Sequence, residues 1–455
     1  MGLCGSYDVA YMATALAGKT FMSTYTVPFA DGTLGFDLPP GMRGTVVTSR
    51  PTPPLEAAGA IRDALRQPLG SPGLDRLPKP GDRVCIAVTD ATRACPDMLL
   101  VPPICAALEL AGVAREDITI LVATGLHRDS TPEEKREKLG AEIAQRYTVV
   151  DHDARDPAGL TELGSGPGGC PLVVNRRAYG SDLIIATGVV EPHQYAGYSG
   201  GGKTLAIGCG GEATIAFTHG PQMLDLPATR LGRIADNPFQ AIVREAARRA
   251  GLRFVLNVIL DDEGRIVAVA AGAPEAVHDH LVAVGTDHYT VAIPHQYDAA
   301  VAGVGWPKDV NLYQASRAAT YLHFAPTPAV RAGGVIIVPA SLPEGAGNGA
   351  GEVRFYRALS EAASPQAVID DAHAHGYPPG QQRAYVVAKV LQHCAILVVG
   401  AQDPDLVRRA HMLATDTMAE ALAVVAARCG PEADVLIVPH ATLTLPVVGM
   451  GTGAE

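Results

Sequence analysis

Long apolar runs, paired cysteines and an excess of positive charge are all missing from this 455-residue chain. No run approaches the roughly 20 apolar residues of a membrane-spanning helix, and the N-terminus lacks the Lys/Arg cluster and apolar core of a signal peptide. The eight cysteines are scattered without a Cys-x-x-Cys pair, which is typical of a reducing compartment. We therefore expect a cytoplasmic protein without a membrane partner.

The charge balance and the length narrow the class of protein further. A formal net charge of −11 argues against a nucleic-acid partner, because binding to phosphates requires a basic face. Hydrophobic residues make up 47% of the chain and charged residues 18%, as in globular proteins. The length favours two domains, which we place at residues 1–290 and 291–455. In an alternative arrangement the last residues return to the first domain.

Apolar runs alternate with helical patterns in the first half of the chain. Residues 132–145 predict a helix, because Thr131 and Glu134 form a capping box with proline between them. Residues 262–264 predict a hairpin turn. The predicted strands are 83–88, 118–123, 147–150, 183–186, 253–260 and 265–270. Strands separated by helices predict a mostly parallel sheet that is covered on both faces.

A second unit with the same alternation begins near residue 294. Its predicted strands are 299–304, 335–338, 395–399 and 435–438, and its predicted helices are 312–323, 382–393 and 418–429. The predicted fold class is α/β, with two α/β domains of mostly parallel sheets and the active site in the cleft between them. Asp90, His127 and the loop from residue 188 each follow a predicted strand, where such sheets usually bind ligands.

The glycine-rich segment 188–220 is the strongest functional signal. It contains His193, Lys203 and His219, and its glycines allow the backbone to approach a ligand closely. One interpretation is a phosphate-binding loop, because residues 197–204 fit the pattern Gly-x-x-x-x-Gly-Lys-Thr and residues 254–261 resemble a Walker B strand. Six residues separate this loop from its strand, however, whereas a phosphate-binding loop follows its strand directly. A nucleotide hydrolase therefore remains an alternative.

Several motifs in chain order carry a more extensive resemblance. Lys203 lies ten residues after His193, and His219 lies sixteen residues after Lys203. The other motifs are Asp90-Ala-Thr-Arg93, Gly125-Leu-His127-Arg128 and Pro307-x-x-x-x-x-Tyr313-Gln314. Together they resemble the nickel-pincer lactate racemases and the related 2-hydroxy-acid racemases and epimerases.

The chemistry of such an inversion can be argued from the substrate. The C2–H bond of a 2-hydroxy acid lies next to an ionised carboxylate and is a very weak acid, so removal of a hydride is easier than removal of a proton. A base then takes the hydroxyl proton, and the flat 2-keto acid receives the hydride on its other face. Histidine is suited to each base, because its pKa lies near neutrality.

The resemblance implies both a cofactor and roles for individual residues. The cofactor is a pyridinium-3-thioamide-5-thiocarboxylic acid mononucleotide with Ni(II), which accepts the hydride. Lys203 would join the cofactor covalently, His219 would bind nickel, and His127 and His193 would be the acid/base pair. The other residues expected at the cofactor are Asp90, Arg93, Ser199 and Gly200, and those expected at a small 2-hydroxy-acid substrate are Tyr313, Gln314 and Arg317.

Each of these residues also has a structural interpretation. His127 would cap the helix at Thr131, His193 would be a turn residue, and His219 would be a surface histidine near a helix end. Lys203 would be a solvated lysine at a helix start, and Asp90 with Arg93 would form a local ion pair. The remaining paired histidines look like helix-surface residues without an assigned role; they are His278, His280, His373 and His375.

Two departures from the family pattern bear on function. Residues 207–210 read Ile-Gly-Cys-Gly where relatives often have Pro-Gly, which is expected to bring Cys209 near the site. Arg317 stands where lactate-active members have a lysine, and its planar fork binds carboxylates differently. The expected substrate is therefore larger or more polar than lactate. A relative that uses another reaction, such as a dehydratase-like step, and a nonenzymatic binding protein remain alternatives.

Overall fold

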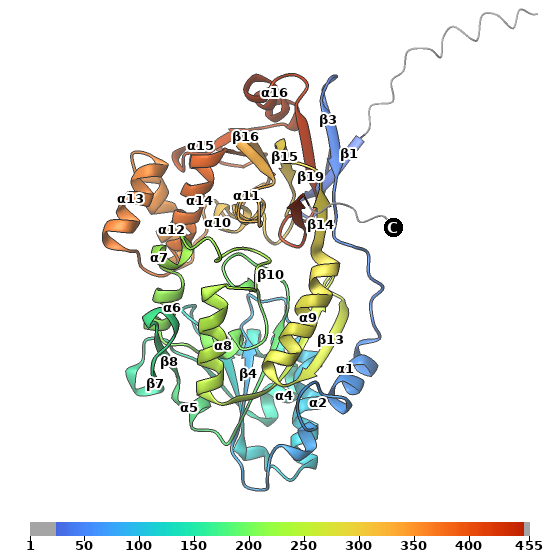
Figure 1. Cartoon of the computed structure of the whole chain (residues 1–455), viewed down its shortest axis with the longest axis vertical. Coiled ribbons are helices and arrows are strands. Elements are labelled where there is room, and N and C mark those ends of the chain that lie inside the picture. Colours follow the sequence, from blue (N-terminus) through green and yellow to red (C-terminus); the bar gives the residue numbers. More distant parts are fainter. Residues whose placement is uncertain (1–23, 450–455) are drawn as a thin grey trace, which may run out of the picture.

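Two six-stranded sheets organise the computed structural model, which describes residues 24–449. Figure 1 shows them as two stacked units, with β4 in the lower unit and β15, β16 and β19 in the upper unit. The predicted α/β class with mostly parallel sheets is confirmed. No helix among the described residues is long and apolar enough to cross a membrane.

The first sheet has the strand order β13-β12-β9-β4-β5-β6 and is parallel except for its edge strand β13. Its strands are β4 (Val84–Thr89), β5 (Ile118–Ala123), β6 (Thr148–Asp151), β9 (Leu183–Val189), β12 (Leu252–Leu260) and β13 (Ile266–Gly272). Alternate residues of β4 pack into two different cores. Ile86 packs with residues of helix α2 (Asp97–Leu110), whereas Ala87 packs with residues of helices α8 (Pro238–Ala250) and α9 (Pro274–Tyr289). Helices therefore cover both faces of the sheet, which explains the uninterrupted apolar runs.

The second sheet has the strand order β18-β17-β16-β15-β19-β3 and is parallel throughout. Its strands are β3 (Arg43–Val46), β15 (Tyr297–Ala302), β16 (Val330–Pro339), β17 (Ala395–Val399), β18 (Leu413–Thr415) and β19 (Asp434–Val438). Helices α14 (Gln382–His393) and α16 (Met418–Cys429) have the predicted bounds. The predicted strands of this unit are all present.

Two predicted helices are divided in the structure. The predicted helix 132–145 becomes α3 (Pro132–Leu139) and α4 (Ala141–Arg146), because Gly140 between them has a φ of 83°. The predicted helix 312–323 becomes α10 (Leu312–Ala315) and α11 (Arg317–His323). There the hydroxyl of Ser316 donates to the carbonyl oxygen of Tyr313 at 2.9 Å, which competes with the backbone ladder.

The N-terminal part of the described chain belongs to the second sheet. The hairpin of β1 (Thr24–Phe29) and β2 (Gly32–Asp37) precedes β3, which pairs with β19. Figure 1 shows β1 and β3 in the upper unit, from which the chain runs down to α1 (Ala57–Arg66). The prediction had placed this segment in the first domain. The sequence of β3 carries no pattern that would predict this pairing, because β3 is a four-residue edge strand without buried residues.

The end of the chain also connects the two units. Strand β20 (Leu445–Val448) pairs with β14 (Thr290–Ile293), and Leu445 packs in a small core with Leu231 of the first unit. The boundary near residue 290 stays a prediction, and residues 1–23 and 450–455 of the predicted domains lie outside the described part.

The carboxyl ends of three adjacent strands converge as predicted. Asp90 follows β4 directly, His127 follows β5 after a short loop, and His193 follows β9. These strands are neighbours in the order β9-β4-β5, so their loops leave the same edge of the sheet.

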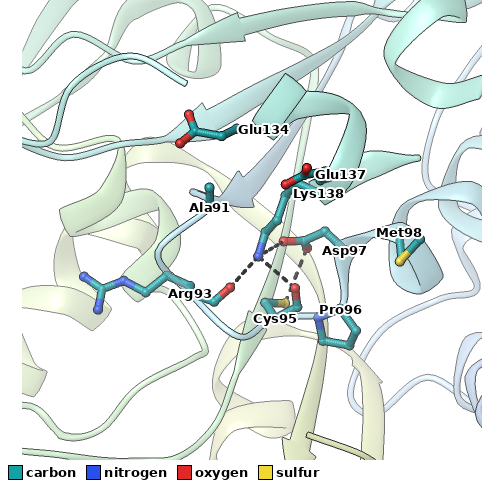
Figure 2. A pocket seen from close by; sticks show the side chains of 9 residues that line it. All are labelled: Ala91, Arg93, Cys95, Pro96, Asp97, Met98, Glu134, Glu137 and Lys138. Atoms are coloured by element: carbon teal, nitrogen blue, oxygen red, sulfur yellow. Dashed lines mark hydrogen bonds and ion pairs between the residues drawn. The ribbon is translucent and has the colours of Figure 1, made fainter. Parts of the chain in front are cut away.

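A buried ion pair holds the loop after β4. Asp97 is fully buried and accepts a hydrogen bond from the hydroxyl of Thr89 at 2.9 Å. Lys138 Nζ lies 3.3 Å from Asp97 Oδ2 and donates to the carbonyl oxygens of Arg93 at 2.7 Å and Cys95 at 2.8 Å (Figure 2). Lys138 thus ties helix α3 to the segment that follows Asp90.

We predict that Asp97→Ala lowers the free energy of unfolding by about 3 kcal/mol or more, because it leaves the Lys138 cation buried without its partner. Glu133→Ala is the matched control: it removes the exposed pair with Arg136 and should change stability by less than about 0.5 kcal/mol. Urea denaturation of both variants measures the difference. Equal midpoints would contradict a supporting role for Asp97.

Candidate active site

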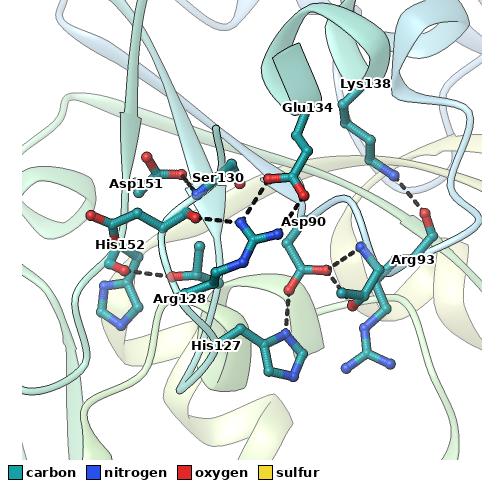
Figure 3. Close-up of polar contacts among 12 residues, drawn as sticks. Asp90, Arg93, His127, Arg128, Ser130, Glu134, Lys138, Asp151 and His152 are labelled. Carbon is teal, nitrogen blue, oxygen red and sulfur yellow. Dashed lines mark hydrogen bonds and ion pairs between the residues drawn. The ribbon is translucent and has the colours of Figure 1, made fainter. Parts of the chain in front are cut away.

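Asp90 and His127 form a hydrogen-bonded dyad at the carboxyl ends of β4 and β5. Figure 3 shows His127 Nδ1 directed at Asp90 Oδ2, at a distance of 2.6 Å. Burial alone raises the pKa of Asp90, but the hydrogen bond and charge of His127, with the charge of Arg93, lower it from 3.8 to about 2. Because a carboxylate only accepts hydrogen bonds, Nδ1 carries the proton and Nε2 is left free. The His127 side chain is about half exposed at 48%.

The structural interpretations of this dyad are wrong. The helix at Thr131 is capped by Thr131 and Glu134 themselves, as the capping box predicts, and not by His127. Asp90 and Arg93 are joined only through the backbone, where the Arg93 amide donates to the Asp90 carbonyl at 3.1 Å. Among residues 24–449 the Arg93 side chain has no ion-pair partner.

The glycine-rich loop does not have the geometry of a phosphate-binding loop. After β9 the chain forms a small hairpin of β10 (Pro192–His193) and β11 (Gly197–Tyr198), and Lys203 is followed by a five-residue π-helix (Thr204–Gly208). A phosphate-binding loop instead joins a strand directly to an α-helix. Asp261, the Walker B candidate, pairs with Arg265 at 2.7 Å in the predicted β12–β13 hairpin. The nucleotide-hydrolase alternative therefore lacks its structural context.

Two buried side chains, Asn257 and His278, form hydrogen bonds to the backbone of the glycine-rich loop. Asn257 Oδ1 accepts from the Gly201 amide at 2.7 Å, and His278 Nε2 lies 3.1 Å from the Ser199 carbonyl oxygen. A Cβ at Gly201 would lie 2.9 Å from the His278 ring, so only glycine fits there. The prediction that His278 is a helix-surface residue is wrong, because it is 1% exposed.

Ser199 and Gly200 also have local roles in this loop. The Ser199 hydroxyl donates to the Val189 carbonyl oxygen at 2.7 Å and accepts from the Glu191 amide at 3.1 Å. Gly200 has a φ of 80°, and a Cβ there would lie 2.5 Å from the Val190 side chain. Contact of either residue with a cofactor stays a prediction.

The other three histidines without an assigned role behave differently from His278. His280 and His375 are exposed, as predicted. His373 is exposed and lies 2.8 Å from Asp225 of the first unit, so it contributes to the contact between the units.

Lys203 is half-buried, and its amino group has no hydrogen-bond or ion-pair partner among the described residues. Loss of hydration, followed by the charge of Arg93, lowers its pKa from 10.5 to about 7, although Glu191 and Asp90 act in the opposite direction. An amine with this pKa is substantially neutral near pH 7 and is therefore nucleophilic. Lys203 is not the solvated lysine of the structural interpretation.

His193 and His219 carry the ring proton on different nitrogen atoms. His193 Nδ1 accepts from the backbone amides of Ala196 at 3.1 Å and Tyr195 at 3.3 Å, so its neutral ring carries the proton on Nε2. His219 Nδ1 lies 3.0 Å from the Ile215 carbonyl oxygen, which only accepts, so Nδ1 carries the proton and Nε2 has a free lone pair. His193 is the last residue of β10, directly before the turn of residues 194–196. His219 is the C-cap of α6 (Glu212–Thr218), so it lies at a helix end as its structural interpretation predicted, but it is half-buried and not a surface residue.

Both rings are poorly hydrated. Burial and then the charges of Lys203 and His219 lower the pKa of His193 well below its usual value. Burial and then the charge of Lys203 lower the pKa of His219 from 6.5 to about 4. Phe239 packs edge-on against the His219 ring, with ring centroids 5.2 Å apart. A neutral imidazole is the form that binds a metal ion.

The structure supports a metal site only if other donors come from outside the chain. Among the described residues no three His, Cys, Asp or Glu side chains lie together as a metal site. His219 would therefore be a single protein ligand. Cys209 was expected near the site but lies fully buried in the core of the first unit, where burial raises its pKa well above the usual value.

The second unit contacts the histidine loop through α11. The Thr320 hydroxyl lies 3.3 Å from Gln194 Oε1, and the Tyr321 hydroxyl lies 3.4 Å from the Pro192 carbonyl oxygen. Arg317 lies on the same helix, and its charge contributes to lowering the pKa values of His193 and Lys203. The structure thus brings Arg317 to the group formed by His193 and Lys203.

Tyr313 and Gln314 lie in the short helix α10, just before Arg317. The Tyr313 ring packs edge-on against Phe355 of α12 (Ala350–Ser360), with centroids 5.4 Å apart. Arg383 of α14, which no sequence motif indicated, places its guanidinium 5.0 Å from the Tyr313 ring centroid. The Gln314 side chain makes no hydrogen bond within residues 24–449.

A surface cavity of about 190 Å³ lies between the segment that follows Asp90 and helix α3 (Figure 2). It is lined by Arg93, Asp97 and Lys138, but not by His127, His193 or His219. The chemistry of the site therefore centres on the histidine and lysine group and not on this cavity.

We predict that an amine-selective acylating reagent modifies Lys203 of the cofactor-free chain with a midpoint near pH 7. The neutral amine is the reactive form, and ordinary lysines become neutral only near about pH 10.4. Peptide mass spectrometry across a pH series gives the profile, with exposed Lys79 as the internal reference. Identical midpoints for Lys203 and Lys79 would show that the Lys203 environment does not stabilise the neutral amine.

Comparison with known proteins gives the same family as the motifs. Residues 29–232 match the lactate racemase N-terminal domain, and residues 295–444 match the lactate racemase C-terminal domain. The chain is 33% identical over 396 residues to the lactate racemase of Lactiplantibacillus plantarum, which covers 85% of this chain and 90% of that protein. It is 28% identical over 425 residues to the lactate racemase of Thermoanaerobacterium thermosaccharolyticum, which covers 92% and 98%.

Solved structures agree with these relationships. The lactate racemase apoprotein from T. thermosaccharolyticum superposes with a TM-score of 0.84 at 27% identity, over 93% of this chain and all (100%) of that one. A Thermotoga maritima protein shares the fold, with a TM-score of 0.67 at 19% identity over 88% of this chain and 100% of that one. The two domain matches cover most of the chain, and the relationship to the L. plantarum enzyme extends over most of both proteins. The chain therefore belongs to the lactate racemase family and is an enzyme of the isomerase class.

Proposed function

We propose that this enzyme inverts C2 of a 2-hydroxy acid with a nickel-pincer pyridinium mononucleotide held by Lys203 and His219. Membership in the lactate racemase family supports a 2-hydroxy carboxylate as the substrate. The observation that carries the proposal is a lysine amine without a partner beside a histidine whose Nε2 is free. The proposal includes a cytoplasmic location, which the unpaired state of the described cysteines supports.

The residues present fit this cofactor. Lys203 supplies a neutral amine for a covalent link, and His219 supplies one imidazole with its tautomer fixed by the Ile215 carbonyl. When bound, the cofactor would supply a hydride acceptor and soft sulfur donors to Ni(II), which suit a square-planar site completed by one imidazole. Arg93, Ser199 and Gly200 lie in the loops that follow β4 and β9 and are proposed to contact the nucleotide.

His127 is suited to accept the hydroxyl proton of the substrate. Its Nε2 is free, and the ionised carboxylate of Asp90 stabilises the imidazolium that forms. His193 instead offers Nε2–H as a hydrogen-bond donor when its ring is neutral. We propose that the two rings lie on opposite faces of the substrate, with His193 first binding its oxygen. To accept a proton at Nε2, His193 must first adopt the other neutral tautomer, with its ring proton on Nδ1, and the two backbone amides then no longer donate to Nδ1.

Arg317 is proposed to bind the carboxylate next to the reacting carbon. It lies on α11, close enough for its charge to act on both His193 and Lys203. A guanidinium binds a carboxylate through two parallel hydrogen bonds, which fixes the orientation of the substrate. Tyr313 and Gln314 precede it in α10 and are proposed to line the same space between the two units.

We predict that Lys203→Ala and His219→Ala each abolish nickel retention by protein made in a host that synthesises the cofactor. Lys203→Ala removes the covalent link, so its intact mass should equal the sequence mass, whereas wild type should carry an adduct. Elemental analysis and intact mass spectrometry measure both properties, with Lys79→Ala as the exposed control. Full turnover of wild type without nickel would refute the proposed cofactor.

We predict that His127→Ala and His193→Ala each reduce turnover by about 100-fold to 10,000-fold in both directions, because each passage uses both faces. Asp90→Asn should also slow turnover, since it removes the charge that stabilises the His127 imidazolium. Chiral chromatography of both enantiomers gives the rates, and nickel content should stay at the wild-type level in the two histidine variants. A His127→Ala variant with normal turnover would exclude His127 from the mechanism.

A further inference from the structure

Two arginines beside the proposed site lack any acceptor for their hydrogen bonds. Arg383 is only 8% exposed, and its Nε and Nη1 atoms are buried without a partner. The Nε atom of Arg317 is buried without a partner as well. Within residues 24–449 neither guanidinium forms an ion pair or donates a hydrogen bond. Buried cations are normally paired, because an unpaired one loses its hydration without compensation.

The position of Arg383 in its helix further destabilises its unpaired charge. Arg383 is the second residue of the twelve-residue helix α14, where the positive end of the helix dipole disfavours a cation. Among the described residues, its guanidinium contacts the face of the Tyr313 ring, with Cζ 5.0 Å from the ring centroid. The Arg383 guanidinium lies over the ring of Tyr313, four residues before Arg317, and α14 packs against α11. Burial and then the charge of Arg383 lower the pKa of Arg317, which is consistent with this geometry. An anion between them would remove each of these penalties.

Two residues of the histidine loop also have buried polar atoms without partners. The Tyr195 hydroxyl and Gln194 Nε2 are buried without hydrogen-bond partners. The charges of Arg383 and Arg317 both act to lower the pKa of Tyr195, whereas burial raises it to about 12. Arg317 is the arginine of this pair whose charge acts on Lys203.

We infer that Arg317 and Arg383 form a two-arginine subsite for a dianionic ligand, and that the substrate is a 2-hydroxy dicarboxylate. The carboxylate next to C2 binds Arg317, and the second carboxylate binds Arg383. This inference rests on the proposed function for the position of C2. A monocarboxylate such as lactate would leave one guanidinium unpaired, whereas a dicarboxylate neutralises both.

The test measures binding to the full-length, cofactor-free chain by calorimetry, with 2-hydroxybutanedioate, lactate and nicotinic acid mononucleotide as ligands. Wild type should bind the dicarboxylate at least about tenfold more tightly than lactate, since one charge-assisted hydrogen-bond pair is worth this much. Arg383→Gln should remove the preference and leave lactate binding unchanged. Arg317→Gln should weaken both ligands, and Arg357→Gln, which removes only an exposed pair with Glu361, should change neither.

Three results would overturn the inference. They are equal affinity of wild type for the two acids, a preference that survives Arg383→Gln, and binding of nicotinic acid mononucleotide that displaces the dicarboxylate and is lost in that variant, which would assign the pair to the cofactor phosphate. If Arg383→Gln does not fold, as judged by its melting curve, Arg383→Lys keeps the charge without the fork and should still lower the preference; an unchanged preference again overturns the inference.

The proposed function can fail separately from this inference. Racemisation of the two acids by cofactor-loaded enzyme is measured alongside binding. A chain that prefers the dicarboxylate in binding but inverts neither acid supports the subsite and refutes the racemase. Inversion of lactate in preference to 2-hydroxybutanedioate, with equal binding of the two, refutes the subsite and leaves the racemase intact.

Discussion

Positive charge without a partner, held where hydration is low, is the constraint on which this site depends. The amine of Lys203 and the guanidinium groups of Arg317 and Arg383 all lack acceptors within the described chain. Elsewhere the fold pairs such groups, as where Lys138 meets the fully buried Asp97. The proposed cofactor and substrate would supply the partners of these three groups. Burial lowers the pKa of Lys203 to about 7, so about half of its amine is neutral at pH 7 and its share of the penalty is reduced.

This arrangement requires both units of the protein. The first sheet brings Asp90, His127 and the glycine-rich loop to one edge, because β9, β4 and β5 are parallel neighbours. Asn257 and His278 bind the backbone of the glycine-rich loop at Gly201 and Ser199, and these contacts fix the position of Lys203 that follows. The second unit adds Arg317 and Arg383 from two different helices. Contacts such as Thr320 with Gln194 join the units next to the site, so a change at this interface would also move the arginines.

Three histidines of the same chemical type differ in what they can do, because different groups hold their Nδ1 atoms. A carboxylate accepts from His127, a backbone carbonyl accepts from His219, and backbone amides donate to His193. The first two rings therefore expose a basic Nε2, and only His127 has an anion behind it to stabilise a positive charge. His219 is suited to a metal ion and His127 to a proton. The resemblance to a family assigns these roles, and the hydrogen bonds give them a physical basis.

The sequence by itself determined the elements whose causes are local. Strand β5 and helices α14 and α16 have the predicted bounds, because uninterrupted apolar runs and caps act over a few residues. The sequence also predicted that Asp90, His127 and the glycine-rich loop each follow a strand of the parallel sheet, and these strands are neighbours. The roles of these residues, and of Lys203 and His219, stay predictions. Only the tertiary structure decided that β3 joins the second sheet, that His278 supports the loop, and that Arg383 lies beside Tyr313. Each of these depends on contact between residues far apart in the chain, and neither local periodicity nor a short motif records which distant residue will be the neighbour.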